Sequence, residues 1–176
     1  MNTIINKIVI PIKELKPGKQ VYEYVVDGKF FSEFGNSQII DALCNVSLEV
    51  ERNSALIEVL LAVKGKVVVE CDRCLEELEL PIDIDRKIMV RFASSDEEEQ
   101  TEDDDVMVLK ERDDDIDLCQ FVYDYICLSL PLQKVHPKGK CNPEMIAKLK
   151  QDIAKKKSKD EYSQFSGLKD LLNNNN

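Results

Sequence analysis

The chain has one histidine among its 176 residues, His136, and it lacks the motifs of common catalytic sites. It contains no Gly-rich phosphate loop, no HExxH motif and no Ser/His/Asp set. Because histidine is the most frequent general base, a single one limits acid–base catalysis. Carboxylates are abundant, but most lie in one run, which is typical of a solvated loop. These absences indicate a protein that is not an enzyme and has no small-molecule substrate.

Long hydrophobic runs are also missing. The longest apolar stretch, residues 118–132, is interrupted by Gln120, Asp124 and Ser129 and is too short to cross a bilayer. The N-terminal segment has no cationic region followed by a long apolar stretch, so no secretory signal is predicted. We therefore expect a soluble cytoplasmic protein without a membrane partner. Its six cysteines should stay reduced, with some of them binding metal.

The net charge of -10 is unevenly distributed along the chain. Between Asp96 and Asp117 there are 13 acidic and 2 basic residues, a local charge of -11. From Lys134 to Asp160 the balance reverses, since nine lysines against three acidic residues give +6. The sequence thus predicts an acidic loop and a basic C-terminal segment.

The length and the 43% hydrophobic content suit one domain with a single core. We expect this domain to span residues 1–172, with residues 173–176 as a disordered tail. Within it, residues 94–115 are so acidic, and so poor in large apolar side chains, that burial would not offset the entropy of ordering them. We expect a mobile loop there, with one short strand at 106–109.

Alternation of apolar and polar residues predicts several consecutive strands with short turns, which favours an antiparallel meander. The pattern is clearest from Cys44 to Glu51, and Gly65 suggests a bend or a bulge in a long strand. The segment 30–43 is ambiguous. The expected strands cover residues 7–15, 20–26, 44–51, 56–69, 78–84 and, after an irregularity, 88–92.

Helical periodicity replaces alternation after the acidic segment. Apolar side chains at helical spacing predict a helix from Asp117 to Leu128, buried against the sheet and closed by Pro131. A basic helix is expected from Met145 to Lys157 and a short one from Gly167 to Leu172. The predicted fold class is α+β: an antiparallel meander that can curl into a partial barrel, covered by one buried helix, with short C-terminal helices.

Cys71-Asp72-Arg73-Cys74 is the one motif that suggests chemistry. Two thiols separated by two residues can hold one soft metal ion from a tight turn, and His136 and Cys141 could complete a tetrahedral zinc site. The predicted metal ligands are therefore Cys71, Cys74, His136 and Cys141.

Two other interpretations of the CxxC pair stay open. Its thiols can be small apolar side chains at the end of a strand. They can also be redox-active, although such pairs usually open a helix, and here Asp72, Glu76 and Glu77 surround them with negative charge. Cys44, Cys119 and Cys127 fall within apolar patterns and are expected in the core.

The basic segment suggests contact with phosphates, although surface lysines also serve solubility alone. No RNP-type aromatic motif is present, and Tyr162 and Phe165 are the only nearby rings that could stack on bases, so sequence-specific readout is not expected. The acidic loop, conversely, could hold a basic protein. The candidate RNA-contacting residues are Arg73, Lys138, Lys140, Lys148, Lys150, Lys155, Lys156 and Lys157.

Several of these motifs together resemble the DUF177 or YceD family. They are Glu70-Cys71-Asp72-Arg73-Cys74-Leu75-Glu76 after a valine-rich strand, the acidic stretch, the apolar helix, and Leu128-Ser129-Leu130-Pro131 before a His/Cys loop. The similarity covers roughly residues 67–141, with a weaker part at 160–172. Many members have several cysteines after the LSLP element, whereas this chain has only Cys141, with His136 nearby.

The resemblance implies a role in accumulation of large-subunit (23S) ribosomal RNA, as in bacteria and plastids. It implies binding to precursor rRNA or to an early, basic ribosomal protein, and it transfers no catalytic residues. The alternative function is a zinc-stabilised protein-interaction module without RNA contact.

Overall fold

The computed structural model describes residues 7–35, 38–53, 56–93, 105–110 and 113–159. Its contacts divide the chain into two compact units. The first, which we call the sheet unit, comprises residues 1–70 and 77–134, and the second, the cysteine unit, comprises residues 71–76 and 135–176. No helix in the described part of the chain is long and apolar enough to cross a membrane.

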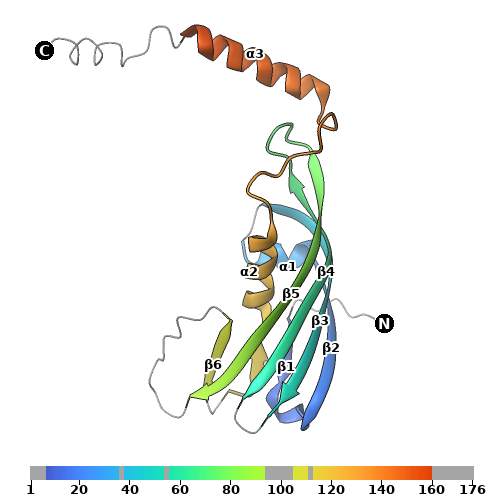
Figure 1. Ribbon diagram of the computed structural model, residues 1–176, viewed down its shortest axis with the longest axis vertical. Coiled ribbons are helices and arrows are strands. Elements are labelled where there is room, and N and C mark those ends of the chain that lie inside the picture. The colour runs from blue at the N-terminus through green and yellow to red at the C-terminus, as the bar shows by residue number, and fades with distance from the viewer. Residues whose placement is uncertain (1–6, 36–37, 54–55, 94–104, 111–112, 160–176) are drawn as a thin grey trace, which may run out of the picture. The chain divides into compact units, whose positions relative to one another are not determined.

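A five-stranded sheet forms the centre of the sheet unit (Figure 1). Its order is β2-β3-β4-β5-β6, and the first four strands form the antiparallel meander that alternation predicts. The sheet does not close into a barrel. The α+β fold class is confirmed. The strands are β2 (Gly18–Asp27), β3 (Ile39–Arg52), β4 (Ile57–Glu70), β5 (Glu77–Ala93) and β6 (Val106–Lys110).

β6 departs from the meander because it pairs parallel to β5, with Val106 opposite Met89 and Lys110 opposite Ala93. It is the short strand expected within the acidic segment. Of the rest of the expected loop, residues 94–104 and 111–112 lie outside the described residues, whereas 105 and 113–115 are described. The expected helix at 167–172 and the tail at 173–176 also lie outside the described residues.

Gly65 lies in regular pairing between Cys44 and Ile82, so of the two expectations, a bend or a bulge, the bulge is wrong. A Cβ atom at this position would lie 2.2 Å from the carbonyl oxygen of Leu43 and 2.6 Å from the Cα of Cys44. The glycine therefore allows β3 and β4 to approach closely, and it does not mark an extra residue inserted into the strand. The register shift of β3 against β4 occurs instead between Ile39 and Asp41.

β5 is a single strand of 17 residues, and the expected irregularity near its middle is absent. The alternation of apolar and polar residues is interrupted there because Arg86, a polar residue, occupies a position on the inward face. The backbone itself stays regular. Its guanidinium lies 5.7 Å from the centre of the Tyr125 ring, which suits a cation–π contact. A long arginine side chain can reach the margin of the core while its charge stays hydrated.

The N-terminal segment differs from the single strand expected at 7–15. β1 (Val9–Pro11) is followed by a 3₁₀ turn, η1 (Ile12–Glu14), and β1 pairs with β7 (Asp115–Asp117) in a separate two-stranded sheet. The backbone N–H of Ile12 continues this connection by donating to the carbonyl oxygen of Asp114 over 2.8 Å. The partner is more than a hundred residues away, so local alternation does not reveal it.

Two helices cover the inward face of the sheet (Figure 1). α1 (Gly28–Glu33) forms the start of the ambiguous segment, whose end belongs to β3. The helix begins at the capping side chain of Asp27 and buries Phe30 and Phe31. α2 (Cys119–Ser129), predicted at 117–128, packs on β5 and buries Val122 and Ile126. The core lies between these helices and the alternating apolar residues of β3, β4 and β5.

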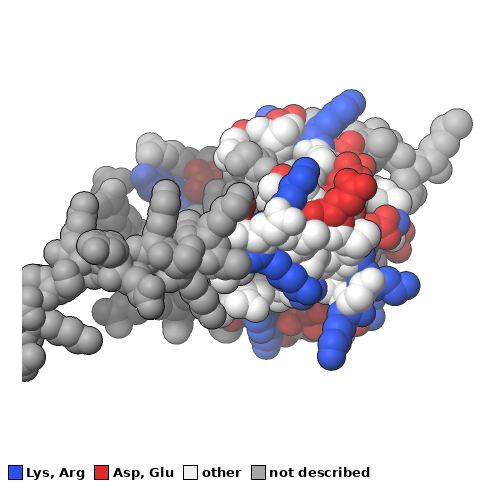
Figure 2. Space-filling view, turned by 90° about the horizontal axis from the view of Figure 1, so that it is seen from above, with Lys and Arg blue, Asp and Glu red and all other residues white. Residues whose placement is uncertain are grey.

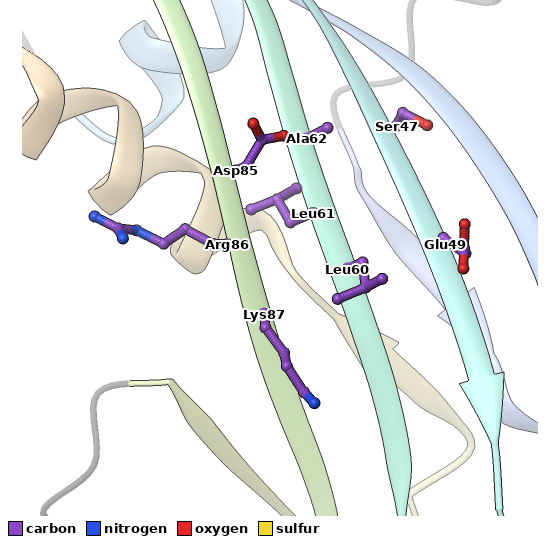
Figure 3. Close-up of a pocket in the computed structure, with 8 residues that line it drawn as sticks. All are labelled: Ser47, Glu49, Leu60, Leu61, Ala62, Asp85, Arg86 and Lys87. Carbon is purple, nitrogen blue, oxygen red and sulfur yellow. The ribbon is translucent and has the colours of Figure 1, made fainter.

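The outward face of the sheet is mainly polar, with exposed apolar side chains such as Leu43 and Leu60 among the charged ones, and ion pairs cross it between neighbouring strands. An open hollow of about 450 Å³ lies on this part of the sheet, and Figure 3 shows its lining residues. The lining has Leu60 and Ala62 beside charged side chains, and it contains no histidine or cysteine that could bind a soft metal. The ion pairs are Lys19–Glu49, Lys64–Asp83, Lys66–Glu79 and Lys87–Glu58.

Candidate metal centre

The CDRC residues form the tight connection between β4 and β5. The backbone N–H of Cys71 donates to the carbonyl oxygen of Glu76 over 2.9 Å, and the N–H of Leu75 donates to the carbonyl oxygen of Cys71 over 2.9 Å. Leu75 has a φ of 61°, in the left-handed region that non-glycine residues seldom adopt. This folded-back turn places both thiols, of Cys71 and Cys74, in buried positions.

The other two candidate ligands lie in the irregular segment between α2 and α3 (Pro143–Lys159). A turn at Pro137 to Lys140, closed by a 3.0 Å backbone hydrogen bond and containing Gly139 at a φ of 83°, reverses the chain between His136 and Cys141. The reversal lets two residues five positions apart face the same point.

All four predicted ligands converge in the cysteine unit. The sulfur atoms of Cys71, Cys74 and Cys141 and a ring nitrogen of His136 lie within 4.8 Å of one another. A single ion can contact all four donors at this spacing. The site could therefore hold a metal, and the arrangement argues against the view that the CxxC thiols are merely small apolar side chains.

Arg73 lies inside the CDRC turn and contributes to the convergence. Its guanidinium donates a 2.6 Å hydrogen bond to the backbone carbonyl oxygen of His136. Because this bond uses the main chain of His136, the imidazole ring is left to face the thiols. Arg73 thus joins the two halves of the cluster and is not simply an exposed cation.

The electrostatics of the cluster favour a thiolate at Cys71. Burial opposes its ionisation, but backbone N–H groups of Arg73, Cys74 and His136, with help from the Cys74 thiol, lower the pKa of Cys71 to about 6. A thiolate is the form that ligates metal.

The neighbouring ligands respond to the same negative charge. Hydrogen bonds to Cys71 and Cys74 raise the pKa of His136 despite some desolvation. Burial and the adjacent thiols raise the pKa of Cys141. The cluster therefore favours a positive charge at its centre, as a metal dication would supply.

The remaining cysteines play no part in this cluster. Cys44 is fully buried in β3, and burial raises the pKa of its thiol to about 11. The sulfur of Cys119 accepts a hydrogen bond from the N–H of Ile8 over 3.1 Å, and burial raises its pKa to about 11. Cys44 is a core residue as expected, whereas Cys119 and Cys127 are only partly buried.

Asn142 and Glu76 also belong to the site, although the sequence pattern gave no reason to select them. The side-chain oxygen of Asn142 accepts hydrogen bonds from the N–H groups of Glu144 and Met145, at 2.9 and 3.4 Å, and so caps α3. Its side-chain nitrogen donates to a carboxylate oxygen of Glu76 over 2.6 Å. An asparagine directly before a proline is a helix-start signal that could have been noticed.

The candidate RNA-contacting lysines are arranged less compactly than the metal ligands. Lys138 and Lys140 are exposed in the loop, and Lys148 and Lys150 are exposed on α3. Lys155, Lys156 and Lys157 continue α3, but their side chains lie outside the described part of the structure. The face in Figure 2 carries basic side chains interspersed with acidic ones.

A family model describing the large ribosomal RNA subunit accumulation protein YceD matches residues 59–172, well over half of the chain. The chain belongs to the YceD family. The match to this family includes the CDRC turn, α2, the His136 to Cys141 loop and α3, but it leaves out the first three strands. No curated protein and no solved structure matches the chain. The YceD name describes an accumulation factor for ribosomal RNA rather than a reaction, and it links the chain to the large ribosomal subunit.

Proposed function

We propose that the protein is a non-enzymatic, cytoplasmic ribosome-biogenesis factor that supports accumulation or processing of large-subunit rRNA. Membership of the YceD family carries this proposal. We further propose that it acts by binding precursor rRNA or an early ribosomal protein, with the cysteine unit as the contact region.

Zinc is the metal that the four donors fit best. Four-coordinate zinc, with bonds of about 2.3 Å to sulfur and about 2.0 Å to nitrogen, places two sulfurs about 3.8 Å apart and a sulfur and a nitrogen about 3.5 Å apart. The Cys71 and Cys141 sulfurs are 3.9 Å apart. The Nδ1 atom of His136 is 3.4 Å from the Cys74 sulfur and 4.0 Å from the Cys141 sulfur.

A zinc ion held by three cysteines and one histidine has no open coordination position, which is typical of structural sites. Its role here would be to hold the CDRC turn against the loop that precedes α3. This role needs no reaction at the thiols. It also agrees with the position of the CxxC pair in a strand connection rather than at the start of a helix.

Contact with RNA would come from cations of the cysteine unit. Lys138 and Lys140 extend from the metal-binding loop, and α3 supplies Lys148, Lys150 and Lys155 to Lys157. Lysines of this kind neutralise phosphates and give affinity without base specificity. Arg73 is less available for RNA because its guanidinium is bound to the carbonyl oxygen of His136.

Depletion of the protein in its host tests the main proposal. Large-subunit rRNA should fall relative to small-subunit rRNA, and precursor particles should accumulate in a density gradient. Re-expression of the wild type should restore the ratio, whereas reversal of Lys155, Lys156 and Lys157 to Glu should restore it poorly. Unchanged rRNA after depletion would contradict the proposal, and full rescue by the reversed variant would remove only the part assigned to these lysines.

A second candidate is a zinc-stabilised protein-interaction module without RNA contact. The net charge of -10 and the exposed apolar side chains Leu149 and Ile153 on α3 favour this alternative. Purification of the tagged protein with and without nuclease separates the two. A particle association that survives nuclease supports a protein partner, such as a basic ribosomal protein, and one that disappears supports RNA.

A further inference from the structure

Strand β2 lies at the edge of the five-stranded sheet and pairs only with β3. Among the described residues, no strand pairs with its other edge. The strand has ten residues and regular pairing from Gly18 to Asp27, with no proline inside it. An edge of this length presents unpaired backbone donors and acceptors and is a template for a further strand.

The outward side chains of β2 show which strand would fit. Every second side chain of β2 points outward, and these include Lys19, Val21 and Glu23. Val21 is 62% exposed. Along this face the strand therefore carries a cation, a branched apolar side chain and an anion at equal spacing. This order is complementary to its own reverse. If a second β2 runs antiparallel with the two Val21 residues opposite each other, each Lys19 faces a Glu23 of the other copy.

We propose that β2 is a self-association edge, and that two copies of this chain pair antiparallel about Val21 to form one continuous sheet across a two-fold axis. The interface is isologous, so the Lys19–Glu23 pair occurs twice. On the inward face, the same register places Gln20 opposite Tyr22 of the second copy. Pairing of strand edges in this way is a common mode of protein recognition.

Other registers do not give this complementarity. Centring the pair on Tyr22 sets Lys19 against Val25 and Val21 against Glu23, which removes both opposite-charge pairs. A shift by one residue would place outward side chains opposite inward ones. Glu23 has no ion pair in the described structure, and Lys19, which contacts Glu49 on its own sheet, can bridge Glu49 and Glu23 of the second copy.

Charge reversal of the two residues provides the test, with mass measured by sedimentation equilibrium as a function of protein concentration. The wild type should dimerise, and Lys19→Glu and Glu23→Lys should each weaken the dimer about tenfold, since each brings two like-charge pairs together. The double variant, Lys19→Glu with Glu23→Lys, should restore the wild-type dissociation constant. Asp85→Lys is the matched control, since Asp85 lies in the same cross-strand row as Glu23 but on β5, three strands away from the β2 edge.

Three results would overturn the proposal. The first is that the wild type stays monomeric at about 100 µM. The second is that neither single reversal weakens the dimer. The third is that the double variant folds but does not recover the dissociation constant of the wild type. If a reversal variant does not fold, Val21→Cys replaces it. Mild oxidation should then link two copies through the introduced thiols, as located by peptide mass spectrometry, and the absence of that linked peptide would contradict the register.

Discussion

Asn142 and Glu76, 66 positions apart in sequence, are joined by a 2.6 Å hydrogen bond between a side-chain amide and a carboxylate. Asn142 also caps α3 and directly follows the candidate ligand Cys141. The start of this helix is therefore tied both to the CDRC turn and to the cluster of four candidate ligands. Any change in the cluster should be transmitted to the first turn of α3.

Replacement of Asn142 should loosen the start of α3. Asn142→Ala removes the cap and the bond to Glu76, and loss of a cap costs about 1 kcal/mol. Faster hydrogen exchange of the amides of Glu144 and Met145 would report the loss. Asn142→Asp retains a good capping oxygen but repels Glu76, so it should protect these amides better than alanine does. Equal exchange in alanine, aspartate and wild type would contradict the capping role.

Metal binding should require all four ligands. Protein purified without chelator should contain about one zinc per chain, as expected for a tetrahedral Cys3His site, and Cys71→Ser or Cys141→Ser should lower the zinc content strongly. Cys127→Ser is the matched control because this cysteine lies outside the cluster, and it should keep the metal. Elemental analysis gives the content, and equal zinc in Cys71→Ser and wild type would exclude the site.

Removal of the metal should affect the two units differently. A chelator should increase hydrogen exchange in residues 71–76 and 135–150, because metal binding to such sites is coupled to local folding. The sheet unit has its own apolar core, with Val59, Leu61 and Ile88 nearly inaccessible, and should be little changed. Uniform loss of protection across both units would show that the sheet also depends on the metal.

Gly65→Ala should destabilise the sheet. The added Cβ would lie 2.2 Å from a backbone oxygen of β3, and neither strand can yield without disturbing regular pairing. We expect a loss of about 2 kcal/mol or more in the free energy of unfolding. Lys64→Ala, at the adjacent exposed position, is the control and should change it by less than about 1 kcal/mol. Chemical denaturation measures both, and equal effects would contradict the close-approach argument.

The buried thiol of Cys44 should make stability fall at alkaline pH. Its pKa is about 11 in the folded protein against 9.0 for an unperturbed thiol, so the unfolded chain loses the proton first as pH rises. Between pH 9 and 11 the folded state binds more protons, and stability therefore decreases by up to about 3 kcal/mol. In chemical denaturation under reducing conditions, the free energy of unfolding of Cys44→Ala should fall less steeply with pH in this range than that of the wild type. Identical slopes would show that the thiol does not contribute.

Local patterns in the sequence predicted the meander and α2 because neighbouring segments pair with each other and share one buried face. They could not predict the partner of β1 or the parallel pairing of β6, since both depend on contacts between distant segments. Arg86 was mistaken for an irregularity because a polar residue on the inward face interrupts alternation without changing the backbone. The spacing of the cysteines was likewise enough to suggest a metal site. The bond between Asn142 and Glu76 could not be predicted, because it depends on how the loop from His136 to Cys141 reverses the chain.

The pairing of β1 with β7 sets an order for folding during synthesis. Translation delivers the N-terminal segment first, and strands β2 to β5 can pair with their neighbours as each leaves the ribosome. Ile10, within this pairing, and Ile8, just before it, are fully buried in the finished protein and become covered only once residues 115–117 are made. Until those residues are synthesised, β1 therefore exposes apolar side chains that have no partner strand, and a chain truncated before residue 115 would keep them exposed.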